Sequence, residues 1–296
     1  MANIGFLACE TTLPGSGQRR GDAYEHDLTI GALQPEMRAH GHDLQVIDWE
    51  APVELFAGID FVLLGTAWNY QDRADAFLNR LEALEKGGIA VCNPSEIVRW
   101  NMTKTYLREL DSAGAPTIPT RWLDRVTATD ARAAMEDFDC DALVVKRQVG
   151  AGALGQELVR RDELSDDWTF ALPAMVQPFL PAIAEHGELS FVFVEGRLSH
   201  ALRKRPAPGD YRIQSLYGGR EETHDSTPGE LDAAHAVVDA LPFPVPLYAR
   251  IDMLKGAQEQ LNLMEVELIE PYLYPEQGPR IGAHIAAAIT RRIAAS

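Results

Sequence analysis

Residues 263–271 read LMEVELIEP, and this short stretch decides how the rest of the chain is interpreted. Apolar residues dominate it, as in a buried β-strand, yet Glu265 and Glu267 place two carboxylates in the same strand. Because side chains alternate between the two faces of a strand, Leu263 is expected on the face of both glutamates and Met264 on the opposite face. A buried carboxylate costs several kcal/mol unless a cation meets it. The stretch therefore predicts a positive group beside this strand.

The preceding apolar segment, LYARIDML at residues 247–254, adds a third acid. By the same alternation Arg250 and Asp252 share one face of it, and the short connection GAQEQ predicts that the two strands pair as a hairpin. Asp252, Glu265 and Glu267 are then expected to converge on one point.

Two interpretations of these three acids stay open on spacing alone. Like charges so close raise one another's pKa unless a cation keeps them ionised. Magnesium bound to nucleotide phosphates is one candidate, since it takes a few carboxylate oxygens and completes its shell with phosphate and water. The alternative is a set of structural salt bridges from Arg250, Lys204 or Arg212.

A glycine-rich segment, LVVKRQVGAGALGQELV at residues 143–159, lies between two strand-like runs. Gly150, Gly152 and Gly155 therefore predict a strand–loop–strand hairpin, not the strand-to-helix turn of a dinucleotide-binding or phosphate-binding loop. The loop is either a simple hairpin connection or a flap whose backbone N–H groups close over phosphates, with Lys146 reaching in from the preceding strand.

The basic residues are concentrated in one region. Arg203, Lys204, Arg205 and Arg212 flank the loop PAPGDY, while Lys104 stands apart in a helix-forming stretch where a lysine is usually solvated. A local cationic cluster opposite a triad of acids is suited to a magnesium–triphosphate complex.

Composition limits the function classes. The formal charge of −17, from 27 basic and 44 acidic residues, argues against general binding to nucleic acid or anionic membranes. Cys9, Cys92 and Cys140 form no CxxC pair, which is typical of the reducing cytoplasm, where we expect the protein to be located. No signal sequence or membrane-spanning stretch is recognised, so we expect a soluble protein. With 296 residues, 46% of them hydrophobic, two or three closely packed units are expected.

Taken together, these segments resemble the ATP-grasp enzymes, and among them bacterial glutathione synthetase and the ligases that form D-cycloserine. The resemblance runs from about residue 93 to residue 271. It rests on motifs in the family's order, namely MVQPFLPAI, the GE of residues 187 and 188, GDYR, GGR, ARIDML and MEVELIEP. Residues 1–93, where short strand-like and helix-like segments alternate, resemble the family's preceding domain in pattern.

The resemblance implies an α/β (α+β) fold of the ATP-grasp type, with two α+β lobes that hold ATP behind a small parallel α/β domain. The expected units are residues 1–93 for the substrate-side domain, 94–172 for the central lobe with the glycine-rich lid, and 173–296 for the C-terminal lobe.

The resemblance also implies roles for individual residues. Those expected to bind ATP are Lys104 and Lys146 at the phosphates, Gly150 and Gly152 in the lid, Gln177, Phe179 and Leu180 around adenine, and Glu188 at the ribose. Lys204 and Arg212 are expected to stabilise the transferred phosphoryl group as catalytic residues. Asp252, Glu265 and Glu267 match the ligands of Mg²⁺, with Mn²⁺ as a substitute. Glu267 stands where the family commonly has Asn, which adds a negative charge.

The implied activity is that of an ATP-dependent carboxylate–amine ligase that activates a small amino-acid-like carboxylate as an acyl phosphate. Ser190 stands where glutathione-forming enzymes carry a substrate-binding arginine, which argues against glutathione as the product. Residues 5–27, residues 68–70 and Glu270 are expected to meet the acceptor. Two alternatives stay open, an intramolecular cyclase of the D-cycloserine-forming type and a nucleotide-binding regulatory protein. A homo-oligomer is expected from the family, and no nucleic-acid or membrane partner.

Overall fold

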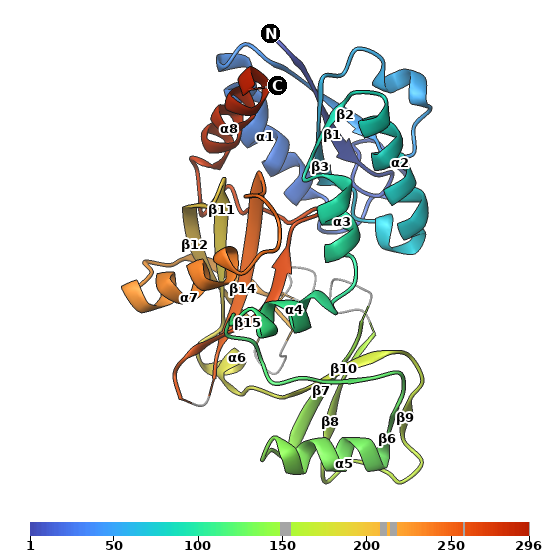
Figure 1. Ribbon diagram of the computed structural model, residues 1–296, viewed down its shortest axis with the longest axis vertical. Coiled ribbons are helices and arrows are strands. Elements are labelled where there is room, and N and C mark those ends of the chain that lie inside the picture. The colour runs from blue at the N-terminus through green and yellow to red at the C-terminus, as the bar shows by residue number, and fades with distance from the viewer. Residues whose placement is uncertain (149–154, 208–211, 214–217, 257, 296) are drawn as a thin grey trace.

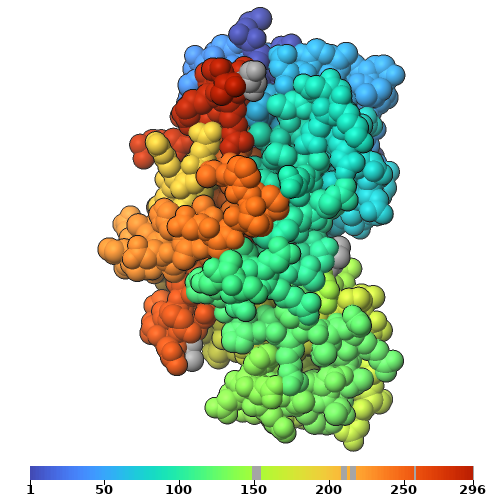
Figure 2. All heavy atoms as spheres, in the orientation of Figure 1, coloured from blue at the N-terminus to red at the C-terminus, as the bar shows by residue number. Residues whose placement is uncertain are grey.

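The computed structural model describes residues 1–148, 155–207, 212–213, 218–256 and 258–295. Three sheets follow one another along the long axis of the molecule, with a short two-stranded ribbon at one end (Figure 1). The space-filling view shows the same succession, with the N-terminal residues at one end and residues of about 120–180 at the other (Figure 2). Among the described residues, no helix is both long and apolar enough to cross a bilayer.

The N-terminal sheet is parallel, as the alternating pattern predicts, with strand order β2-β1-β3-β4. Its strands are β1 (Asn3–Ala8), β2 (Asp43–Asp48), β3 (Phe61–Thr66) and β4 (Ala90–Cys92). The connections contain α1 (Tyr24–Ala39), η1 (Val53–Phe56), η2 (Tyr70–Arg73) and α2 (Ala74–Lys86). Helix α2 buries its apolar side on one face of this sheet.

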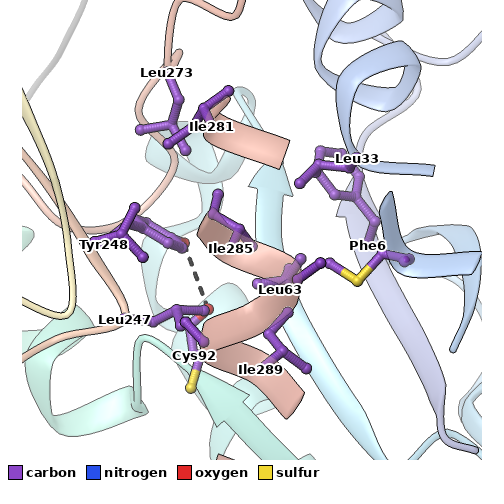
Figure 3. Packing of buried hydrophobic residues seen from close by; sticks show 14 of the residues in the cluster. Phe6, Leu33, Leu63, Cys92, Leu247, Tyr248, Leu273, Ile281, Ile285 and Ile289 are labelled. Atoms are coloured by element: carbon purple, nitrogen blue, oxygen red, sulfur yellow. Dashed lines mark hydrogen bonds between the residues drawn. The ribbon is translucent and has the colours of Figure 1, made fainter. Parts of the chain in front are cut away.

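The opposite face of the N-terminal sheet is covered by α1 together with α8 (Ile281–Ala295). Figure 3 shows Ile281, Ile285 and Ile289 of α8 among side chains of the first sheet and of the C-terminal sheet. The last helix of the chain thus completes the core of the first unit, which the expected division at residue 93 does not capture.

The middle sheet is antiparallel, with order β5-β10-β7-β8. Its strands are β5 (Arg121–Leu123), β7 (Ala142–Arg147), β8 (Gln156–Arg160) and β10 (Ala174–Pro178). Helix α5 (Ala128–Asp137) packs on one face, and β6 (Val126–Thr127) pairs with β9 (Thr169–Phe170) beside it. Strand β10 begins beyond residue 172, so the expected end of the central lobe leaves out one strand of the central sheet.

The C-terminal sheet has the order β13-β12-β11-β14-β15, with antiparallel neighbours throughout. Its strands are β11 (Glu188–Val194), β12 (Arg197–Arg205), β13 (Arg220–Thr223), β14 (Tyr248–Lys255) and β15 (Leu261–Glu267). The predicted hairpin β14–β15 forms, and β11–β12 forms another with its turn at residues 195–196. The remaining helices are α3 (Ser95–Asn101), α4 (Tyr106–Ser112), α6 (Ala182–Glu185) and α7 (Pro228–Asp239).

The two faces of this sheet differ. Leu189, Phe191 and Phe193 of β11 point toward α4 and α7 and join one hydrophobic core. The alternate residues Glu188 and Ser190 point to the other face, where they are buried among polar side chains. One face is therefore apolar throughout, and the other is polar at the end nearer the middle sheet.

The expected alternation along β15 is wrong at its first half. Asp252 lies opposite Glu265, but the next residue, Met253, lies opposite Leu263, which leaves Met264 as the extra residue of a β-bulge. Leu263 therefore turns into the apolar core instead of sharing the face of the glutamates. Met264 turns to the polar face, where it packs beside a small cluster around Leu254.

Candidate active site

A cavity of about 200 Å³ lies between the middle sheet and the C-terminal sheet. From the middle sheet, β7 and β10 contribute Val144, Lys146, Met175 and Gln177. The residues that alternate with them point to the opposite face and fill the core under α5. From the C-terminal sheet, β11, β12, β14 and β15 contribute their polar face. The alternation of two antiparallel sheets thus directs both rows of side chains into one space.

The predicted site residues that the structure describes all line this cavity. They are Lys104, Lys146, Gln177, Phe179, Leu180, Glu188, Lys204, Arg212, Asp252, Glu265 and Glu267. Gly150 and Gly152 lie outside the described residues, although the hairpin that carries them, β7–β8, forms as predicted. Residues from six strands and several loops, far apart in the sequence, are therefore brought together.

The acids on β14 and β15 are interleaved with cations. Arg250 lies opposite Glu267 in the strand register and forms ion pairs with Glu267 and with Asp252, the latter at 2.9 Å. Lys104, from the turn before α4, forms an ion pair with Glu265. The positive partners of Glu265 and Glu267 on β15 are therefore Lys104 and Arg250.

A second ion-pair group joins β11, β12 and β14. Lys204 Nζ lies 2.5 Å from Glu188 Oε1 and 3.4 Å from Asp252 Oδ2, and these side chains are at most 4% exposed. Ser190 donates its hydroxyl to Asp252 Oδ1 at 2.5 Å. Asp252 therefore links the two cationic side chains Arg250 and Lys204 at the centre of the site.

Burial and neighbouring charges shift the pKa values of these groups in opposite directions. Burial raises the pKa of Asp252, but Arg250 and Lys204 outweigh it and hold that pKa below its ordinary value. Burial lowers the pKa of Lys204, and Asp252 and Glu188 outweigh it, so the net shift is upward. For Glu188 burial prevails over Lys204 and raises the pKa to about 7.

Two further pKa shifts concern groups that face the cavity. Burial, with a smaller contribution from Lys104, lowers the pKa of Lys146 to about 8. Desolvation, opposed by Arg250 and reinforced by Glu265, raises the pKa of Glu267 to about 7. Strongly shifted groups that cluster in one cleft are typical of functional sites.

The three acids predicted as metal ligands do not form a preassembled metal centre. In the described part of the chain, no three His, Cys, Asp or Glu side chains are gathered so that they could hold a metal ion. Of the salt bridges that the sequence suggested, those of Arg250 and Lys204 are observed, whereas Glu265 pairs with Lys104. The donor set nevertheless fits a hard cation, because all three are carboxylates on one cavity wall and carboxylate oxygens are the ligands that Mg²⁺ prefers.

An apolar wall adjoins the charged one. Ile118, Ile183, Ile213 and Leu254 form a buried cluster against which Phe179, Leu180 and Met264 pack. Gln177 presents a buried amide beside this wall and donates to Thr120 Oγ1 at 3.0 Å. An apolar wall next to cations suits a ligand with an aromatic ring at one end and negative charge at the other.

Sequence reasoning missed several cavity residues. Met264 points into the cavity because of the β-bulge, which no sequence pattern within β15 predicts. Tyr274 lines the cavity with a φ of +48°, and its ring lies 5.7 Å from Lys204 Nζ and 5.5 Å from Arg250 Cζ. Tyr274 is far from Lys204 and Arg250 in the sequence, so no local pattern predicts their contact.

Beyond Leu263, which pairs with the backbone of residues 116–118, the edge of β15 is held by side chains. Asn101 of α3 donates to Val266 O at 2.9 Å and accepts from Leu268 N at 2.9 Å. Tyr106 of α4 donates to Val266 O at 3.1 Å and accepts from its N–H at 2.9 Å. These bonds satisfy the edge of the sheet and fix the strand that carries the glutamates.

The segments expected to meet an acceptor lie beside the end of this strand. Trp68 donates its indole N–H to Glu270 O at 3.1 Å, and the guanidinium of Arg20 lies 5.1 Å from the centroid of the Trp68 ring. Tyr70 and Glu270 line a second, smaller cavity and not the large one. The loops after β1 and β3 are thus next to the proposed catalytic strand.

The chain is similar to proteins of known class. The family description "D-cycloserine synthetase DcsG, N-terminal domain" matches residues 4–93. The cycloserine biosynthesis protein DcsG of Streptomyces lavendulae is 27% identical over 265 residues, which cover 83% of this chain and 88% of that protein. The glutathione synthetase of Prochlorococcus marinus is 31% identical over 194 residues, covering 62% of this chain and 59% of that protein.

Solved structures show the same fold. The crystal structure of D-cycloserine synthetase DcsG superimposes with a TM-score of 0.80 at 21% identity, covering 98% of this chain and 99% of that one. The ATP-grasp ligase PsnB, complexed with a phosphomimetic variant of its minimal precursor, Mg and ADP, gives a TM-score of 0.66 at 16% identity, covering 97% and 98%. The predicted ATP-grasp fold is therefore confirmed.

Proposed function

The chain is an ATP-grasp enzyme homologous to DcsG and to bacterial glutathione synthetases, and on this premise we propose that it is an ATP-dependent carboxylate–amine ligase for small amino-acid-like substrates. One observation carries the proposal. A single cavity between two antiparallel sheets combines an apolar wall, several cations and three carboxylates. Adenine, phosphates and a divalent cation need these three environments side by side.

ATP is assigned to the cavity by the chemistry of its walls. Phe179 and Leu180 would pack on adenine and Gln177 would face its edge, while Glu188 would accept from the ribose hydroxyls. Lys104 and Lys146 would hold the phosphates, together with the backbone of Gly150 and Gly152. The ion pairs of Lys104 with Glu265 and of Lys204 with Glu188 are then exchanged, at least in part, for contacts with the nucleotide.

Mg²⁺ is assigned to Asp252, Glu265 and Glu267, with Mn²⁺ as a substitute. The ion, when bound, neutralises charge on the phosphoryl oxygens. Arg250, which pairs with two of these acids in the described structure, would keep their side chains aligned. Their cross-strand register, Asp252 opposite Glu265, keeps the carboxylates on one wall.

The proposed reaction has two steps. A substrate carboxylate oxygen attacks the γ-phosphorus, the bond to the bridging oxygen breaks, and ADP leaves with an acyl phosphate formed. An amine then attacks the acyl carbon, loses a proton and displaces inorganic phosphate. Lys204 and Arg212 would stabilise the transferred phosphoryl group, since phosphoryl transfer depends mainly on positioning and electrostatic stabilisation.

Ring closure within one substrate molecule is the second candidate. The match to DcsG spans 83% of this chain, including the N-terminal unit, whereas the match to glutathione synthetase spans 62%. An intramolecular reaction of the D-cycloserine-forming type would give a product lighter than its substrate by one water, with no second substrate required.

The organisation of the chain is part of the proposal. We assign residues 1–93 to substrate binding, residues 94–172 to the central lobe, and residues 173–296 to the C-terminal lobe, from which β10 joins the central sheet and α8 closes the first unit. Cysteine usage supports a cytoplasmic location, and a homo-oligomer is proposed by analogy with the family.

The test is phosphate release from ATP and Mg²⁺ in the presence of pools of amino acids and their derivatives, followed by mass spectrometry of the products. We expect at least one pool to stimulate release and Lys146→Ala to abolish it. Lys86→Ala is the matched control, because the Lys86 side chain is 80% exposed and far from the cavity. ADP formation that no pool stimulates would contradict the ligase assignment.

A further inference from the structure

Arg250 lies between two of the three acids of the large cavity. Its Nη2 donates to Glu267 and, at 2.9 Å, to Asp252 Oδ2, and its Nε donates to Asp252 Oδ1 at 3.1 Å. One guanidinium therefore bridges carboxylates of two neighbouring strands, as a divalent ion does in a metal centre. This arrangement accounts for the finding that, over the described ranges, no three acids are grouped so that they could hold a metal ion.

The guanidinium of Arg250 is held in place by further contacts. Its Nη1 donates to the carbonyl oxygen of Tyr272 at 3.0 Å, and the ring of Tyr274 lies 5.5 Å from Cζ. Tyr274 holds this position with a φ of +48°, a conformation that costs free energy in a residue with a side chain. Arg250 is only 6% exposed and still lines the cavity, so its positive charge is a fixed part of the cavity wall.

The acceptor sites of Asp252 are almost filled. A carboxylate offers about four lone pairs. Ser190 and Arg250 Nε donate to Oδ1, Arg250 Nη2 donates to Oδ2, and Lys204 Nζ lies 3.4 Å from Oδ2. Under the proposed function Lys204 turns to the transferred phosphoryl group, which leaves one lone pair of Asp252 for an ion. Asp252 can therefore serve one divalent ion, and a second ion would have to displace Arg250.

The formal charge of the cavity also fits one ion. Among the described residues that line it, six are basic and four are acidic. A nucleoside triphosphate adds about four negative charges at neutral pH. One divalent ion then balances the charges of the cavity, whereas a second ion would leave the cavity positive.

We propose that Arg250 is a resident cation of the phosphate site, which bridges Asp252 and Glu267 in the place of a second divalent ion, so that the protein binds one ion per nucleotide. Sites for phosphoryl transfer use one or two divalent ions, so the reaction alone does not fix this number. The inference deepens the proposed function and rests on it for the nucleotide and for the first ion. Arg250 acts here as a positioning residue for the metal ligands.

The first test counts bound ions and requires no knowledge of the substrate. The whole protein is dialysed against Mn²⁺ and a non-hydrolysable ATP analogue, and bound metal and bound nucleotide are measured. We expect one Mn²⁺ per nucleotide in the wild-type protein and in Arg132→Ser, which loses only the exposed pair with Asp166. Two Mn²⁺ per nucleotide in the wild-type protein would overturn the inference and leave the ligase standing. Failure to bind the nucleotide or any metal would instead refute the site of the proposed function.

The second test asks whether a divalent ion can replace the guanidinium. In Arg250→Ser the shorter side chain leaves space beside Asp252 and Glu267, so the count should rise to two Mn²⁺ per nucleotide. Without nucleotide, we expect magnesium chloride in place of potassium chloride, at equal ionic strength, to raise the unfolding midpoint of Arg250→Ser by about 2–4 °C more than that of the wild-type protein.

Arg132→Ser is the matched control for this effect and should respond to Mg²⁺ as the wild-type protein does. An equal response of Arg250→Ser and the wild-type protein, with no second Mn²⁺ in the variant, would overturn the inference. If Arg250→Ser does not fold, the ion count of the wild-type protein decides alone.

Discussion

Asp252 and Glu265 lie directly opposite each other on β14 and β15, yet each is neutralised by different cations. Asp252 pairs with Arg250 and Lys204, and Glu265 pairs with Lys104. Two facing carboxylates would otherwise repel each other, so the cations allow this register to form. The described ion pairs and the proposed metal site are therefore two ways of compensating the same charges.

Removal of Arg250 should destabilise the protein strongly. In Arg250→Met, the 2%-exposed Asp252 keeps only the more distant Lys204, so a loss of about 3–5 kcal/mol is expected in denaturant unfolding. The double variant Arg250→Met/Asp252→Asn should lose less than the sum of the two single variants, because position 252 then carries no charge that needs Arg250, although Glu267 still loses its partner.

The control for this experiment is the exposed pair Arg132–Asp166, 2.6 Å apart with 40% and 93% side-chain exposure. Arg132→Met should change the free energy of unfolding by no more than about 1 kcal/mol. Strict additivity of the Arg250 and Asp252 variants would contradict the coupling described for the site.

The pKa of Lys146 predicts a pH dependence of ATP binding. Since burial lowers that pKa to about 8, the ammonium form is complete below this value and is lost as the pH rises through it. The KM for ATP should therefore rise by up to about tenfold between pH 7 and pH 9. Lys146→Arg, whose guanidinium stays charged, should show a flatter profile over this range. Identical profiles for the two proteins would show that another group titrates.

Glu267→Asn tests the extra charge of this site relative to the commoner residue of the family. Metal affinity depends on the charge of the ligands, so the half-saturating Mg²⁺ concentration for ATP turnover should rise by about tenfold while turnover at saturating Mg²⁺ persists. Arg250 retains Asp252 as a partner, so the fold should persist. Removal of divalent ions with a chelator should abolish turnover in both proteins. An unchanged Mg²⁺ requirement in Glu267→Asn would exclude Glu267 as a ligand.

Gly187 should tolerate no side chain. Its φ is +75°, and a Cβ there would lie 2.4 Å from the carbonyl oxygen of Lys204. Gly187→Ala should lower the free energy of unfolding by more than about 1 kcal/mol and weaken ATP binding, because Glu188 and Lys204 would shift. Gly229→Ala is the control, since a Cβ at that helical position meets nothing within 4 Å. Equal stability of the two variants would contradict the close approach at Gly187.

Local patterns predicted the parts of the site that lie within single hairpins. Alternation placed Arg250 beside Asp252 on one face, and short connections predicted the β7–β8 and β14–β15 hairpins, because these features depend on neighbours in sequence. The inward position of Met264 depends on the hydrogen-bond register with β14, which the sequence of β15 alone does not encode. The place of Tyr274 between Lys204 and Arg250 depends on the course of a loop, and the strand β10 depends on long-range pairing with β7.

The sequence identified some residues of the site without identifying the residues that they contact. The densest basic region was recognised from composition along the chain, and Lys204 from it indeed enters the site. The partner of Lys104 was not anticipated, since only the folded chain brings the turn before α4 against Glu265.

The packing of α8 on the first sheet affects how the protein can be made. Ile281, Ile285 and Ile289 cover apolar side chains such as Phe6 and Leu63, which leave the ribosome long before them. During synthesis the first unit carries an uncovered apolar face until the final helix emerges, so it depends on the rest of the chain to mature. Removal of α8 should therefore damage the first unit and not only the end of the chain.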